Sequence, residues 1–276
     1  MERHCKVQGV DTAYWEYNPD KTPTLLLIHG FRGTHHGLLK VAEQLSEYRL
    51  IVPDLPGFGE SAALDTEHSI ANYVVWLHHF RATVDTAGSS FIVGHSFGTI
   101  VTSHYAAAYP NEVHKLVLIN PIGAPALEGN QRLLTQLAIL YYWLGRKLPD
   151  SAARAWISLK PITKVMSITM RKTKDRSLRR YIDEQHYAHF STFANPAQLA
   201  EAFNASVTHD VSQVAEKLHI PTLLIAGEKD DITSLAKQRH LHSRIAGAKL
   251  VVIAGVGHLT HYETPDQVAA AIRAFI

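Results

Sequence analysis

Six short apolar runs, separated by segments of helix length, constrain the fold of this chain more than any other feature of its sequence. A strand that is apolar on both faces belongs in a parallel sheet with helices on both sides. Helical periodicity is present in residues 36–48, 69–85, 96–109, 234–245 and 265–275. The alternation predicts an α/β fold with a mostly parallel, doubly wound sheet. The strand-like runs are "TLLLI" from Thr24, "LIVPD" from Leu50, "SFIVG" from Ser90, "KLVLIN" from Lys115, "TLLIAGE" from Thr222 and "KLVVIAG" from Lys249.

One interval interrupts this alternation. Between residues 121 and 209 the sequence has helical periodicity, broken at Pro149, Pro161 and Pro196, and it has no buried-strand pattern. An interval of that length is too long for a simple connection. We therefore predict a helical cap at residues 121–209, inserted into a core that consists of residues 1–120 and 210–276.

Composition and charge disfavour several classes of protein. The chain has 27 Lys and Arg against 25 Asp and Glu, and a net charge of +2 does not indicate a nucleic-acid partner. The single cysteine, Cys5, cannot form an internal disulfide, so nothing indicates an oxidising compartment. The amino terminus lacks the apolar segment of a signal peptide, and the longest apolar run, from Leu137, is shorter than the ~20 residues of a membrane span. We expect a soluble, cytoplasmic protein, either a monomer or a homodimer.

Metal and cofactor patterns are weak in this sequence. Two histidine pairs, His35 with His36 and His186 with His189, have suggestive spacings, but no metalloprotease motif or paired cysteines accompany them. Phosphate-binding loops and dinucleotide fingerprints are also missing from the sequence. We therefore expect no metal and no cofactor, and we expect a small-molecule substrate that is handled by side chains and backbone groups.

The segment "GHSFG" places Ser96 between a predicted strand and a predicted helix, with Gly94 and Gly98 two residues away on either side. This is the G-x-S-x-G pattern in the strand–turn–helix context that it requires. We expect a turn so sharp that a β-carbon at either glycine would clash. The start of the following helix favours negative charge, because its peptide N–H groups point toward the turn. Ser96 is therefore the candidate nucleophile.

A serine hydroxyl is a weak nucleophile until a base takes its proton. The candidate base is His258, because it follows the last buried strand and precedes the closing helix, and His261 is the second choice. An acid must orient the imidazole and stabilise its protonated form. Asp230 and Asp231 both follow the preceding strand and are both candidates. The chain order Ser, Asp, His, with each residue at the carboxyl end of a parallel strand, favours a catalytic triad.

With these residues identified, the sequence resembles the α/β-hydrolase family over essentially the whole chain. The family's fold has a mostly parallel sheet, and its inserted helical cap usually roofs the substrate pocket, which matches the interval at residues 121–209. The resemblance rests on five segments: "HGFRG" at His29, "DLPGFGES" at Asp54, "GHSFG" at Gly94, "GEKDD" at Gly227 and "GHLTHYETP" at Gly257.

The resemblance also implies roles for individual residues. Ser96 is implied as the nucleophile, His258 as the base, and Asp230, at the last position of G-x-x-D, as the acid. Asp231 stays a lesser possibility for the acid. An oxyanion hole is implied from the backbone N–H groups of Phe31 and Phe97.

The predicted cap suggests a substrate class. The segment "LLTQLAILYYWLG", from Leu133, is apolar on most of its circumference, so we expect it to be buried or to face a ligand cavity. Leu137, Tyr141 and Trp143 are candidate substrate contacts and indicate a mostly hydrophobic acyl or aromatic substrate. Arg32, beside the proposed oxyanion donor, is a candidate for binding a substrate carboxylate, with exposure to solvent as the alternative.

The cap is also rich in basic residues. From Arg146 to Arg180 the sequence has eleven Lys and Arg, opposed by Asp150 and Asp175. Such a segment is typical of a solvated face, and it could also attract an anionic substrate, an acidic carrier protein or an acidic membrane surface.

We predict a carboxylesterase-like serine hydrolase that cleaves an ester or related acyl bond through an acyl-enzyme. Serine at position 96 disfavours the members of the fold that use an aspartate nucleophile, such as haloalkane dehalogenases and epoxide hydrolases. Two alternatives stay open. One is a C–C bond hydrolase or lyase that acts with the same triad on a carboxylated substrate, with Arg32 or the basic cap as the counter-charge. The other is a ligand receptor without catalytic activity.

Overall fold

The computed structural model describes residues 1–85, 90–125 and 132–276, and its strands form an eight-stranded sheet in the order β1-β2-β4-β3-β5-β6-β7-β8. The hairpin β1–β2 and the pair β2–β4 are antiparallel, and every pair from β4 to β8 is parallel. The predicted mostly parallel α/β sheet is confirmed. The strands are β1 (Glu2–Val7), β2 (Val10–Tyr17), β3 (Thr24–Ile28), β4 (Arg49–Pro53), β5 (Ser90–His95), β6 (Val113–Ile119), β7 (Thr222–Gly227) and β8 (Lys249–Ile253).

Helices cover both faces of the sheet, as the doubly apolar runs require. In β3, Leu25 and Leu27 belong to one apolar cluster, whereas Leu26 and Ile28 belong to the cluster on the opposite face. The first cluster includes α1 (His35–Glu43) and α11 (Pro265–Phe275). The second includes α2 (Ile70–Val84), α3 (Phe97–Ala108) and α9 (Leu235–Arg244). Shorter helical turns are η1 (Pro110–Glu112), η2 (Val211–Gln213), η3 (Ala215–Lys217) and α10 (Thr260–Glu263).

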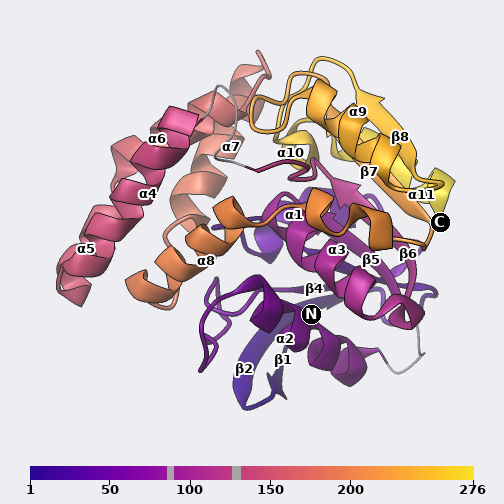
Figure 1. The fold of residues 1–276 in the computed structure, drawn as a ribbon, viewed down its shortest axis with the longest axis horizontal. Helices are drawn as coiled ribbons and strands as arrows, with labels where there is room; N and C mark the ends of the chain where they lie inside the picture. Colours follow the sequence, from indigo (N-terminus) through magenta and orange to yellow (C-terminus); the bar gives the residue numbers. More distant parts are fainter. Residues whose placement is uncertain (86–89, 126–131) are drawn as a thin grey trace.

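Five helices, named here the cap helices, lie in the chain between β6 and β7. Figure 1 shows them as a group, coloured pink to orange, to one side of the sheet. The prolines that break the helical pattern mark helix starts: Pro149 immediately precedes α5, Pro161 is the second residue of α6 and Pro196 is the first of α8. The division of the chain into core and cap stays a prediction. The cap helices are α4 (Arg132–Lys147), α5 (Asp150–Ile157), α6 (Lys160–Met170), α7 (Arg176–His189) and α8 (Pro196–Thr208).

One predicted strand differs from its expected environment. The run at 249–253 does form β8, but Val251 and Val252 are exposed because β8 is the last strand of the sheet. An apolar run alone does not reveal that a strand will have a neighbour on one side only.

The order of the strands determines where a site can form. From β3 the chain adds β4 on one side and then β5 on the other, so the connections after β3 and β5 diverge across a topological switch point. Open α/β sheets bind ligands at such a point, outside the carboxyl ends of the strands. The loop after β3 contains Phe31 and the turn after β5 contains Ser96.

A helix that spans a membrane must be long and mostly apolar. Among the helices in the described ranges, none is long and apolar enough to span a bilayer.

Candidate active site

Ser96 lies in a sharp turn between β5 and α3. Its backbone has φ 52° and ψ −118°, a conformation that L-residues rarely adopt. A β-carbon on Gly98 would lie 2.4 Å from the carbonyl oxygen of Ile28, and one on Gly94 would lie 2.7 Å from the carbonyl oxygen of Gly98. Both distances are too short for any side chain, so the predicted need for glycine at the two positions is confirmed.

Three side chains from separate strand ends form a hydrogen-bonded relay. His258 Nε2 lies 2.8 Å from Ser96 Oγ, and His258 Nδ1 lies 2.8 Å from Asp230 Oδ2. Because an ionised carboxylate can only accept, the Nδ1–H group of His258 donates to Asp230, which leaves Nε2 to accept the serine proton. Ser96 follows β5, Asp230 follows β7 and His258 follows β8. The parallel sheet thus brings to one edge three residues that are far apart in sequence.

The Asp230 carboxylate is buried and densely hydrogen-bonded. Burial by itself would raise its pKa, but the adjacent His258 and the hydrogen bonds that it receives hold the pKa of Asp230 below its ordinary value. Oδ2 accepts from Asn120 Nδ2 at 2.9 Å and from Thr233 Oγ1 at 3.1 Å. Asp231, the other candidate acid, has an exposed side chain that pairs with Lys172. The structure therefore brings Asp230 to the imidazole and not Asp231.

Two backbone N–H groups beside Ser96 lack an acceptor among the described residues, those of Phe31 and Phe97. Phe97 is the first residue of α3, where helical N–H groups have no partner within the helix. A β-carbon on Gly30, which precedes Phe31, would lie 3.2 Å from Ser96 Cβ, so the loop after β3 passes close to the serine. His29 fixes this loop, because its Nδ1–H donates to Gly30 O and its Nε2 accepts from Leu55 N–H. Both N–H groups belong to segments that adjoin Ser96, and their role as oxyanion donors stays a prediction.

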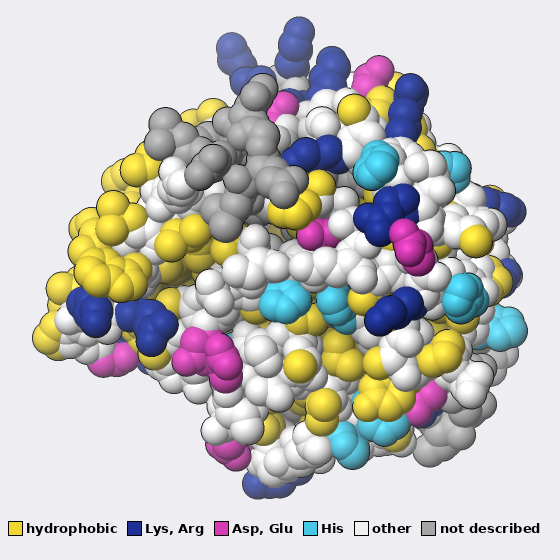
Figure 2. All heavy atoms as spheres, viewed as in Figure 1, with side chains coloured by type: hydrophobic (Ala, Val, Ile, Leu, Met, Phe, Trp, Pro, Cys, Tyr) yellow, Lys and Arg dark blue, Asp and Glu magenta, His cyan; other side chains and the backbone are white. Residues whose placement is uncertain are grey.

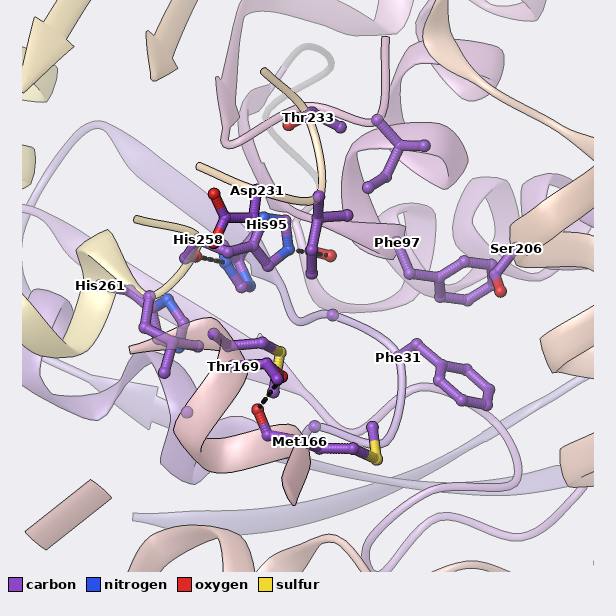
Figure 3. A pocket seen from close by; sticks show the side chains of 18 of the residues that line it. Phe31, His95, Phe97, Met166, Thr169, Ser206, Asp231, Thr233, His258 and His261 are labelled. Carbon is purple, nitrogen blue, oxygen red and sulfur yellow. Dashed lines mark hydrogen bonds between the residues drawn. The ribbon is translucent and has the colours of Figure 1, made fainter. Parts of the chain in front are cut away.

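The relay opens into a cavity of about 650 Å³ between the sheet edge and the cap helices. Its wall is mostly apolar and includes Phe31, Phe97, Met166, Phe203 and Leu259. Figure 3 shows Phe31 and Phe97 on one side of this space and the imidazoles of His95, His258 and His261 on the other. The cavity therefore combines a large apolar volume with polar groups gathered near the relay.

Three further histidines line the cavity, and all are buried. His95 Nε2–H donates to the carbonyl oxygen of His258 at 3.3 Å, and its ring lies 3.9 Å from that of His261. The Nδ1 atoms of His186 and His261 have no partner in the part of the chain that the structure describes. Burial lowers the pKa of His95 to about 3 and that of His186 to about 4, and it lowers the pKa of His261 well below the ordinary value of histidine. These imidazoles are therefore neutral at neutral pH.

The structure contradicts the prediction that Arg32 binds a substrate carboxylate or points to solvent. Its guanidinium group is buried and does not line the cavity. Nε donates to Phe190 O at 2.8 Å and Nη2 to Ile157 O at 3.1 Å, while Nη1 lies 3.4 Å from Tyr142 Oη. Arg32 therefore ties the loop after β3 to three of the cap helices or their ends.

The three predicted cap contacts also lie outside the cavity wall. Leu137 and Trp143 are about half exposed on the outer side of α4. Tyr141 packs against Trp156 and donates to its carbonyl oxygen at 2.9 Å. The helix α4 is apolar on most of its circumference, but its outer side is exposed to solvent. The cavity contacts of the same helix are Thr135 and Ala138.

Sequence reasoning missed residues that support the site. Asn120 adopts φ 46° and donates to both Asp230 and the carbonyl oxygen of Gly257. Its signal was its position, a polar residue at the end of the buried run "KLVLIN". His186 lies four residues after the buried Ile182 on α7, and that helical spacing was the signal for its burial.

Residues that could hold a metal are not gathered at this site. Within the described ranges, no group of three or more His, Cys, Asp or Glu side chains has a metal-binding arrangement.

Comparison with known proteins gives one family and several relatives. A family profile described as the alpha/beta hydrolase fold matches residues 23–265. Lipase 1 of Psychrobacter immobilis is 27% identical over 262 residues, which are 91% of this chain and 76% of that protein. Monoacylglycerol lipase ABHD6 of Mus musculus is 26% identical over 272 residues, 94% of this chain and 76% of that protein. A thermophilic esterase from Thermogutta terrifontis has a similar structure, with a TM-score of 0.79 and 21% identity over 99% of this chain and 97% of that one.

The contacts of Arg32 predict a structural effect of its removal. Arg32→Met should lower the free energy of unfolding by roughly 2–5 kcal/mol, because a buried and a part-buried carbonyl group lose their donor. The matched control is Arg146→Met, an exposed cap arginine, which should leave stability unchanged. Urea denaturation measures both. Unchanged stability in Arg32→Met, together with a raised KM for carboxylated substrates alone, would restore the carboxylate-binding role.

The buried histidines predict a loss of stability in mild acid. Below about pH 6.5 the unfolded chain binds protons at His95, His186 and His261, whereas the folded chain does not until the pH falls to their lowered pKa values. Their contribution is complete above about pH 6.5 and is lost as the pH decreases, by on the order of 1 kcal/mol per pH unit for each histidine.

Urea denaturation between about pH 7 and about pH 5 measures this slope. His186→Gln should flatten it, because one proton-binding difference between the two states is removed. The control His219→Gln changes an exposed histidine and should leave the slope as it is. Equal slopes for wild type and His186→Gln would show that His186 is protonated in the fold.

Proposed function

The chain belongs to the alpha/beta hydrolase family, and we propose that it is a serine hydrolase that cleaves an ester or related acyl bond. The observation that carries this proposal is the continuous relay from Asp230 through His258 to Ser96, with 2.8 Å between each pair of atoms. Relatives named lipase and monoacylglycerol lipase, at 27% and 26% identity, support an ester substrate.

The first half of the proposed reaction forms an acyl-enzyme. Ser96 Oγ attacks the carbonyl carbon of the substrate while its proton moves to His258 Nε2. The carbonyl oxygen becomes an oxyanion and accepts hydrogen bonds from the N–H groups of Phe31 and Phe97. The imidazolium then gives its proton to the leaving alcohol as the bond between carbon and that oxygen breaks.

The second half releases the acid. A water molecule gives a proton to His258 and attacks the acyl carbon, and a second oxyanion forms in the same place. His258 then returns the proton to Ser96 Oγ as the acyl group leaves. Asp230 stays ionised throughout, which its lowered pKa favours, and it stabilises the imidazolium that forms in each half.

The cavity supports a mostly hydrophobic acyl group. Its apolar wall contains phenylalanine, methionine, leucine and isoleucine side chains, and its buried histidines beside the relay are neutral at neutral pH. Burial of an extended acyl chain is favourable by about 0.8 kcal/mol for each CH₂ group. The residues that supply this wall differ from Leu137, Tyr141 and Trp143, but the substrate class is the same as the one the sequence indicates.

The alternative of a carboxylated substrate loses its main support. It relied on Arg32 or the basic cap as the counter-charge, and the guanidinium group of Arg32 is engaged with carbonyl groups of the cap. Lys172, a basic residue on the cavity wall, is paired with Asp231. A receptor without activity is also disfavoured, because binding alone does not require an aligned proton relay.

A fluorophosphonate probe tests the nucleophile. We expect covalent labelling of Ser96, located by mass spectrometry of the labelled peptide, and no labelling of His258→Ala.

Ser96→Ala should keep its fold and lose roughly 10⁶-fold in kcat. Asp230→Asn should lose about 10⁴-fold because it alters the histidine tautomer, whereas the neighbouring Asp231→Asn serves as the matched control and should stay close to wild type. Normal turnover by folded Ser96→Ala would refute the proposed mechanism.

A series of p-nitrophenyl esters tests the acyl preference. We expect kcat/KM to rise from acetate to longer straight chains, because each added CH₂ group contacts the apolar wall. A matched series with a terminal carboxylate should react more slowly, since the charge would lose its hydration inside the cavity. A flat profile, or faster reaction of the carboxylated esters, would contradict a hydrophobic acyl site.

A further inference from the structure

The outer side of α4 is apolar where a surface helix is usually polar. Leu137 is 54% exposed, Leu140 49% and Trp143 51%, and with Leu144 they form a stripe at helical spacing. The opposite side of the helix is also apolar, because Tyr142 is buried against Phe203. Figure 2 shows hydrophobic side chains gathered over the part of the molecule where Figure 1 places α4 and α5. Clustered exposure of this kind marks an interaction surface.

The exposed apolar surface is not confined to one helix. On α6, Val165 is 60% exposed and Ile168 is 50% exposed. Ile168 also lines the cavity, as do Thr135 and Ala138 of α4. Both α4 and α6, which carry exposed apolar side chains, are therefore also walls of the candidate active site.

Basic groups adjoin the apolar stripe at the end of α4. Trp143, Arg146 and Lys147 enclose a small surface pocket of about 160 Å³, and Lys147 Nζ lies 5.5 Å from the centre of the Trp143 ring. In the described ranges neither cation forms an ion pair with a carboxylate. From residue 132 to residue 170 the sequence has six Lys or Arg and one acidic residue, Asp150, which pairs with Arg154.

We propose that the outer face of α4, with the Trp143–Arg146–Lys147 pocket, docks onto an anionic phospholipid bilayer. Leucine side chains would enter the acyl boundary, Trp143 would lie at headgroup level and the two cations would contact lipid phosphates. A second copy of this chain fits the face less well. The helix ends with Arg146 and Lys147 and contains no acidic residue, so the same helix of a second copy has no carboxylate to pair with these two cations.

The same docking places the cavity wall against the membrane, because α4 supplies both surfaces. Binding to lipid is nevertheless separate from the proposed catalytic function, since it involves none of the relay residues. A vesicle-binding assay therefore tests the surface without any measurement of turnover, and a failure of one proposal does not imply a failure of the other.

Vesicle sedimentation is the primary experiment. We expect the wild-type protein to bind vesicles of phosphatidylcholine mixed with phosphatidylglycerol and to bind vesicles of phosphatidylcholine alone much more weakly. Arg146→Glu/Lys147→Glu should lower the partition coefficient at least about tenfold, because each cation near an anionic leaflet contributes on the order of fivefold. The matched control, Lys217→Glu/Arg239→Glu, makes the same charge change at exposed positions outside the cap and should reduce binding far less.

Tryptophan fluorescence gives a second readout. Anionic vesicles should shift the emission to shorter wavelength, and Trp143→Phe should remove most of that shift, since Trp143 leaves water on docking. Arg146→Glu/Lys147→Glu should keep wild-type activity on a short, water-soluble ester, which shows that it folds.

Three results would overturn the proposal. The first is an absence of binding to anionic vesicles, and the second is equal binding by wild type and Arg146→Glu/Lys147→Glu. The third is a wild-type dimer in size-exclusion chromatography that Leu140→Asp converts to a monomer, which would make this face a contact between copies of the chain.

Discussion

The close backbone contact between the start of α3 and the end of β3 is the constraint on which the candidate site depends. Gly98 lies so near the carbonyl oxygens of Ile28 and His29 that a β-carbon would be 2.4 Å from one and 2.6 Å from the other. The turn before α3 has the positive φ of Ser96 next to this contact. It also brings the free N–H of Phe97 and the loop that carries Phe31 to the same side chain, so the nucleophile and both proposed oxyanion donors depend on one contact.

Electrostatics beside Ser96 depend on a contrast between the ionised Asp230 and several neutral imidazoles. Asp230 keeps its charge although it is buried, because His258, Asn120 and Thr233 surround its oxygens with donors. The histidines farther along the cavity lack such partners, and burial keeps them neutral. The charge of Asp230 therefore acts on a protonated His258 among neutral imidazoles, and a low local dielectric strengthens its effect.

The sequence predicted the core of the site better than it predicted the cap, for a physical reason. Ser96, Asp230 and His258 follow apolar runs at the carboxyl ends of three strands, and the geometry of a parallel sheet brings such positions together. Arg32 carried no comparable information, because a guanidinium group beside a loop can reach solvent, substrate or another segment. Its partners, the carbonyl oxygens of Phe190 and Ile157, are backbone atoms more than a hundred residues away. Periodicity could not identify the inner side of α4, since both of its sides are apolar.

The apolar character of both sides of α4 has a structural consequence for the cap. A helix with one apolar side would be fixed by burying that side against the core, as α11 is through Val268 and Ile272. In α4 the inner side is satisfied by Tyr142 against Phe203, while Leu137, Leu140 and Trp143 remain in water at a cost to the free energy of the isolated protein. A surface that removes these side chains from water recovers that cost, and because Thr135 and Ala138 of the same helix line the cavity, binding there acts directly on the wall of the candidate active site.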